Sequence, residues 1–156
     1  MAAQRTYTLV FAGLTGLTAV PFLQLATPAT TGIELLAVEI TQEASATSAQ
    51  AVMSIMRRTT ASTLPTATAP LALNQNDPPS LLTSSTTTNA VGVATVNGTA
   101  GNVLVRLGFN VLNGLFWYPV PEQRITVAPS SFLTLQFPTA PAADTWSGQV
   151  YFRELE

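Results

Sequence analysis

Apolar and polar residues alternate along much of the chain, and this pattern predicts β-strands. In the opening stretch RTYTLVFAGLTGLTAVPFLQL, Tyr7, Leu9 and Phe11 alternate with Thr and Val, and Gly13 and Gly16 then predict a turn. Polar residues, glycines and a proline interrupt the stretch before it reaches the about 18 consecutive apolar residues of a membrane-spanning helix. We therefore interpret it as the first strands of a folded domain, and not as a secretory signal or a membrane anchor.

Two further segments predict strands in the first half of the chain. Residues 32–43, GIELLAVEITQE, are largely apolar on both alternating faces, as expected of a central strand. Residues 50–60 fit either a strand or a helix that begins at Ser45 or Ser48. We favour the strand, because the segment runs into a pair of threonines and has no glycine at its end to stop a helix.

Asn-Gly pairs predict tight turns in the second half. Asn97-Gly98 and Asn113-Gly114 are strong hairpin signals, because both residue types tolerate the positive φ of such turns. The alternating segments SSFLTLQF and TWSGQVYFREL then close the chain. About eight to nine short strands, with no convincing amphipathic helix, predict an all-β fold. We expect an antiparallel β-sandwich of jelly-roll type, formed as a single domain by residues 1–156.

A long segment rich in Thr, Ser, Ala and Pro separates the predicted strands at residues 61–88. Its four prolines exclude a central strand. A connection of this length within a compact domain is usually functional or disordered. Because the segment has almost no charge, we expect an extended arm that lies on the domain or on a partner, with a meandering surface loop as the alternative.

Composition indicates a surface that is partly covered by other protein. Of the 156 residues, 47% are hydrophobic and only 9% are charged, with a net charge of -2, so the surface is weakly protected against association. All six basic residues are arginines, which suit interfaces, although compositional drift gives the same bias. The largest basic cluster, Arg57-Arg58, is too small to neutralise a row of phosphates, which argues against nucleic-acid binding.

Residue types also limit the chemistry. The chain has no His and no Cys, and so lacks the commonest general base, thiol nucleophiles and the usual zinc ligands. A glycosidase pair of Glu34 and Glu122 has no supporting spacing. Asp77 with Asn74 and Asn76 gives calcium a single carboxylate, and an Asx turn explains these residues more simply. We expect no enzyme activity, no cofactor and no metal site.

The densest apolar feature is the run Leu115, Phe116, Trp117 and Tyr118. Consecutive strand residues point to opposite faces, so at least one of these aromatic residues points away from the domain's own core unless a second layer covers it. Two interpretations follow: burial within the sandwich, or a subunit interface, where aromatic residues and Arg are enriched.

Several segments resemble, in order and spacing, a group of small proteins encoded near bacteriophage head genes. They are IELLAVEITQEASAT with AVMSIMRRTT, NDPPSLL with TTTNAVG, GFNVLNGLFWYPVPEQRI, SSFLTLQF and PTAPAADTWSGQVYFREL. The group is that of capsid decoration, or cement, proteins, single jelly-roll domains that assemble as trimers similar to tumour-necrosis-factor-like heads. The resemblance spans residues 5–155. The chain departs from the group in being less acidic around TQEASATSAQ and less rich in glycine in the long segment.

The resemblance implies a structural virion protein on the outer surface of a phage capsid, made in the bacterial host cytoplasm. It implies two partners, further copies in a homotrimer and the major capsid protein of the phage head, with neither nucleic acid nor membrane involved. The candidate residues for subunit or capsid contacts are Arg5, Tyr7, Arg57, Arg58, Pro65, Pro70, Leu115, Phe116, Trp117 and Tyr118. Deletion of residues 61–80 is then expected to abolish attachment and to preserve the β-rich circular dichroism.

Two other functions fit the same fold. A jelly-roll module of a phage capsid or tail fibre would bind a host glycan or receptor, with Trp117 or Tyr118 stacked on a sugar ring. A capsid shell subunit would instead form closed particles on overexpression. An enzyme ranks last among these interpretations.

Overall fold

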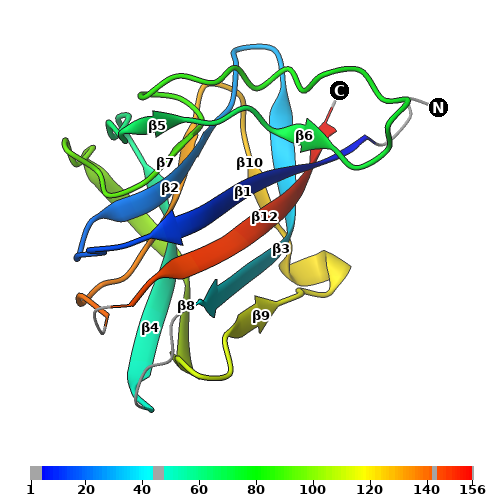
Figure 1. Ribbon diagram of the computed structural model, residues 1–156. Helices are drawn as coiled ribbons and strands as arrows, with labels where there is room; N and C mark the ends of the chain where they lie inside the picture. The colour runs from blue at the N-terminus through cyan, green and yellow to red at the C-terminus, as the bar shows by residue number, and fades with distance from the viewer. Residues whose placement is uncertain (1–4, 44–47, 142–143, 156) are drawn as a thin grey trace.

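The computed structural model describes residues 5–43, 48–141 and 144–155, which form a sandwich of two antiparallel sheets (Figure 1). Sheet A runs in the order β10 (Ile125–Val127), β3 (Gly32–Gln42), β12 (Trp146–Leu155), β1 (Thr6–Leu14) and β6 (Leu71–Ala72), with β9 (Leu115–Trp117) also paired to β3. Sheet B runs in the order β5 (Thr66–Ala67), β7 (Ala90–Val91), β2 (Pro21–Ala26), β11 (Phe132–Gln136), β4 (Gln50–Arg58) and β8 (Ala100–Asn110). A short 3-10 helix, η1 (Pro121–Gln123), lies between β9 and β10. The predicted antiparallel β-sandwich is confirmed.

The inner faces of the two sheets meet in one apolar core. In sheet A, Leu9 on β1 lies opposite Val150 on β12, and both side chains are fully buried. At one end of the core, the ring of Trp146 lies 6.2 Å from that of Phe109 and 5.2 Å from that of Phe137, measured between ring centroids. Such edge-to-face and tilted contacts stabilise aromatic clusters beyond the area that they bury. Trp146 and Val150 both lie on the core side of β12, which confirms the predicted alternation along this strand.

The ambiguous segment at residues 50–60 forms strand β4, and the helix alternative is wrong. Ala51, Met53 and Ile55 are buried against the core at a spacing of two, which is the period of a strand. β4 lies between β11 and β8, so its backbone is paired on both sides.

The predicted turns have mixed outcomes. Gly13, near the end of β1, and Gly16, in the connection to β2, both adopt positive φ, in agreement with the predicted turn. Gly114 also has positive φ, but it joins β8 of sheet B to β9 of sheet A and closes no hairpin. The hairpin predicted at Asn97-Gly98 is wrong, because β7 pairs with β2 and β5 whereas β8 pairs with β4.

The long segment forms a third layer on the outer face of sheet B. It adds β5 to one edge of sheet B, where β5 pairs with β7, and β6 to the edge of sheet A, so it crosses from one sheet to the other (Figure 1, green). Ser62, Leu64 and Leu82 within it are buried. Beneath it, Gln24 and Thr134 in the middle of sheet B have no exposed surface. The expected extended segment therefore lies on its own domain.

Candidate functional site: the outer face of sheet A

The outer face of sheet A is bare, in contrast to that of sheet B. Within the described residues, no segment lies across its middle, and large apolar side chains there face solvent. Tyr118 is 62% exposed, Phe116 57% and Leu73 54%, and Val10 is also exposed. Tyr151 joins them from the centre of the sheet, on the strand face opposite Val150. An apolar surface of this kind is typical of an interaction site.

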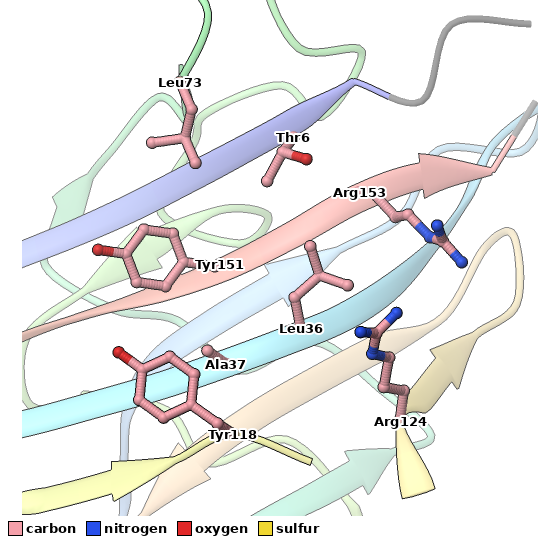
Figure 2. A pocket seen from close by; sticks show the side chains of 8 residues that line it. All are labelled: Thr6, Leu36, Ala37, Leu73, Tyr118, Arg124, Tyr151 and Arg153. Carbon is pink, nitrogen blue, oxygen red and sulfur yellow. The ribbon is translucent and has the colours of Figure 1, made fainter. Parts of the chain in front are cut away.

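A pocket of about 480 Å³ lies on this face and has the size of a small-molecule or side-chain site (Figure 2). The rings of Tyr118 and Tyr151 line one end, with their hydroxyls pointing the same way, and Leu36 lies between them and the arginines. Arg124 and Arg153 project toward one another at the other end. The pocket therefore joins an aromatic wall to a cationic rim.

An ion-pair cluster holds the cationic rim in place. Glu34 on β3 lies opposite Arg153 on β12, and its Oε2 atom contacts the Nε atom of that arginine. The same Oε2 atom lies 3.7 Å from Nη1 of Arg124. Glu34 thus serves two guanidinium groups, whereas Glu122 is exposed in η1, so the glycosidase arrangement has no support.

A second, acidic groove of about 270 Å³ crosses the opposite part of the face, lined by Val10, Glu39, Thr41, Glu43, Ser147 and Gln149 among others. The Nε2 group of Gln149 donates to Glu39 Oε2 at 2.5 Å and to the Tyr151 hydroxyl at 2.6 Å. Ser147 Oγ donates to Glu43. Burial, and secondarily the charge of Glu39, raises the pKa of Tyr151. Within the described residues, neither carboxylate has a cationic partner.

The predicted contact residues are divided among several environments. Arg57, Pro65, Phe116 and Tyr118 are exposed, and Arg5 and Trp117 are half-buried. Tyr7, Arg58, Pro70 and Leu115 are buried. Buried side chains present no surface to a partner, so these four are removed from the candidate surface. Of the exposed set, only Phe116 and Tyr118 lie on the bare face.

The adjacent arginines on β4 differ sharply. Arg57 donates from Nη2 to the carbonyl of Thr126 at 2.9 Å and so links sheet B to sheet A. Arg58 donates to Thr134 Oγ1 at 3.2 Å, to the Gly98 carbonyl and to Gln136 Oε1, all neutral acceptors beneath the third layer. Burial lowers the pKa of Arg58. Arg58 is therefore a structural residue.

Sequence patterns revealed only part of this face. Tyr151 was identifiable, because it alternates with buried residues along the last strand. Leu71 and Leu73 gave no signal, because they lie in a segment without periodicity and reach the face only through the pairing of β6 with β1.

The described residues contain no group of three or more Asp, Glu, His or Cys side chains placed to hold a metal ion. The amide of Asn76 donates to Asn74 Oδ1 at 3.1 Å, which confirms the Asx turn. In the described part of the chain, no helix is long and apolar enough to cross a membrane. No protein-family model matches the sequence, and a search of curated proteins finds no match.

Proposed function

We propose that this protein is a structural virion component: a homotrimeric decoration protein of jelly-roll type that binds the outside of a bacteriophage head. The order of the main strands supports the jelly-roll assignment. Strands β1 to β4 alternate between the two sheets, as do β10, β11 and β12, and the sheets carry them in the orders β10-β3-β12-β1 and β2-β11-β4-β8. This interleaving is the one that two Greek keys produce in a jelly roll.

The observation that carries the proposal is the asymmetry of the sandwich. The chain's own third layer covers the middle of the outer face of sheet B, over Gln24 and Thr134, whereas the outer face of sheet A exposes Phe116, Tyr118 and Leu73. Monomeric proteins seldom expose so apolar a surface, and a neighbouring subunit would remove it from water. With the sequence resemblance, this supports a homotrimer that buries sheet A between its subunits.

Attachment to the head follows from repetition. A trimer presents three copies of each contact to the major capsid protein, so modest individual contacts add up to strong attachment through their high effective concentration. Such a trimer on the outer surface would clamp neighbouring capsid subunits.

The test is native mass over a dilution series, followed by localisation. A species of about 49 kDa, three times the 16.4 kDa chain mass, that persists on dilution supports the trimer. An antibody against the chain should then label intact heads of the phage that encodes it. A monomer at all concentrations, or a protein absent from purified virions, contradicts the proposal.

The structure changes one of the tests expected from the sequence. Deletion of residues 61–80 would remove Ser62 and Leu64, which are buried in the third layer. Sheet B would then be uncovered, and loss of attachment could not be separated from loss of the fold. Substitutions of exposed residues are therefore the cleaner test.

The pocket between the two tyrosines favours a second function, a glycan- or receptor-binding module. Tyr118 and Tyr151 form an aromatic wall on which a sugar ring could stack, and Arg124 supplies hydrogen-bond donors at the other end of the pocket. Glycan arrays separate the two functions, because saturable binding that Tyr118→Ala abolishes would support the module. A trimer that buries sheet A would show none.

A further inference from the structure

Strand β8 is an unusually open sheet edge. It has eleven residues and pairs on one side only, with β4. The other edges are formed by β5 and β6, with two residues each, and by β9 and β10, with three each. Because β6 covers only Tyr7 and Thr8 of β1, the rest of β1 is a second, shorter open edge. Proteins usually protect a long edge with proline or several charges, because its free backbone groups can pair with another chain. β8 has no proline, exposes Val103 and has one charged residue, Arg106.

Arg106 is a cation without a partner among the described residues. Its side chain is exposed, and no hydrogen bond or ion pair joins it to another described residue. Arg57 and Arg58 on β4, Arg124 between η1 and β10, and Arg153 on β12 all contact neighbours within the domain. An exposed guanidinium on an open edge is suited to a carboxylate on another molecule.

Carboxylates that could pair with Arg106 lie on the other sheet, in the acidic groove of sheet A. Glu39 and Glu43 line the groove on the outer face of sheet A and are hydrogen-bonded to the neutral groups of Gln149 and Ser147. Val10 gives the groove an apolar wall. The outer face of sheet A thus has a groove with two carboxylates and an apolar wall. The β8 edge of sheet B has an exposed valine and one arginine.

Charge determines how two copies can meet through these surfaces. A two-fold contact of β8 with β8 would bring two Arg106 side chains together, and groove against groove would bring the glutamates together. Like charges across an interface are destabilising. Edge against groove instead pairs opposite charges. Because it joins two different surfaces, this contact is heterologous and can close into a ring.

We infer that β8 of one copy lies in the groove of the next, with Arg106 paired to Glu39 or Glu43 and Val103 against Val10. The inference rests on the proposed self-association and specifies its partner surfaces. Each copy therefore uses one surface toward one neighbour and the other surface toward the next. The affinity of the contact falls as salt screens the ion pair.

Charge reversal with rescue tests this pairing. Arg106→Glu and Glu43→Arg should each raise the concentration at which the trimer half-dissociates at least about tenfold, and the double variant should return it close to the parent value. Glu122→Arg, at an exposed position on η1, is the matched control and should leave that concentration unchanged. Circular dichroism of each variant verifies the fold.

The outcomes are distinguishable. If the parent protein is a trimer and Arg106→Glu leaves its dissociation unchanged, or if Arg106→Glu rescues neither Glu43→Arg nor Glu39→Arg, the pairing is wrong and the proposed function stands. If the parent protein is a monomer throughout, both fail. Glu39→Arg repeats the swap within the groove, so an effect at Glu39 with none at Glu43 still supports the inference if Arg106→Glu rescues it.

Discussion

The side chain of Gln24 and the main chain of Ser62, 38 residues later, are hydrogen-bonded in both directions. Ser62 N donates to Gln24 Oε1 at 2.7 Å, and Gln24 Nε2 donates back to the Ser62 carbonyl at 3.3 Å. The same Nε2 group donates to the carbonyls of Thr87 and Thr88, each at 2.9 Å. One buried amide on β2 therefore fastens both ends of the long segment to sheet B.

Replacing this amide should loosen the third layer. In Gln24→Met the volume is nearly kept, but the backbone groups of Ser62 lose their partner in a buried site. We expect the free energy of unfolding to fall by about 1 to 3 kcal/mol, the usual cost of a buried unpaired polar group. Urea denaturation measures it. Gln123→Met, at an exposed position on η1, is the control, and equal stability of the two variants would contradict the assigned role.

Arg58 should be intolerant of lysine. Its planar fork reaches Thr134, Gly98 and Gln136 at once, whereas an ammonium group on a flexible stem cannot satisfy all three. We expect Arg58→Lys to lower the midpoint of thermal unfolding, with a loss of about 1.5 to 3 kcal/mol. The neighbouring substitution Arg57→Lys should cost less than about 0.5 kcal/mol. A reversed order would show that the buried contacts do not stabilise the fold.

Gly148 allows β12 to lie close to β3. A β-carbon at this position would collide with the carbonyl oxygen of Glu39 and would lie 2.8 Å from the ring of Phe11. Gly148→Ala should therefore destabilise the protein by about 1 to 3 kcal/mol, as overpacking does. Gly108→Ala places the same methyl group where nothing lies within 4 Å, and calorimetry should find it close to the parent. Similar melting temperatures for both variants would refute the collision.

Stability should decline at alkaline pH in a way that depends on Tyr7. Its hydroxyl donates to the Pro78 carbonyl at 3.2 Å. Burial, and next the charge of Glu154, raises the pKa of Tyr7 above its ordinary value of 10.0, against the opposing effect of Arg5.

The direction in which stability changes with pH follows from proton linkage. Above about pH 10 the unfolded chain releases this proton while the folded protein retains it, so stability falls as the pH rises. Tyr7→Phe should cost about 1 kcal/mol at neutral pH, through the lost hydrogen bond, and should make the alkaline decline shallower. Denaturation at several pH values between about 8 and 11 measures the slopes, and parallel slopes would disprove the linkage.

The bare face of sheet A should control self-association. Tyr118→Ser removes the ring that is most exposed there, and we expect the trimer to dissociate at about tenfold or higher concentration, because aromatic anchors dominate interfaces. Val96→Ser changes a side chain of similar exposure, 58%, outside this face. Analytical ultracentrifugation of the two variants should find only the first one weakened. Equal dissociation would exclude the face as the interface.

Much of the fold could be predicted from local pattern. The alternation along the last strand separates Val150 and Phe152, which are buried, from Gln149 and Tyr151, which face outward. Gly13, near the end of β1, and Gly16, just after it, likewise adopt positive φ in the turn that the sequence predicts. These features depend on residues that are neighbours in the chain, and no distant contact is needed to produce them.

Covering layers, in contrast, depend on which distant segments meet. Arg58 appeared suited to an interface and became buried, because Gly98 and the segment around Ser62 lie over its side of sheet B. The Asn97-Gly98 pair closes no hairpin, since the strands that flank it pair elsewhere. Local preference for a turn does not specify strand pairing.

On the outer face of sheet A, too, local pattern determined some features and tertiary packing determined others. Period-two alternation by itself established that Phe116 and Tyr151 point away from their strand neighbours, because strand side chains alternate whatever the strand pairs with. Only the tertiary structure decided that both lie on the same uncovered face of sheet A as Leu73, and that Arg106 is on an open edge. Whether the outward side of a strand becomes a surface or a buried layer depends on the packing of segments far apart in sequence.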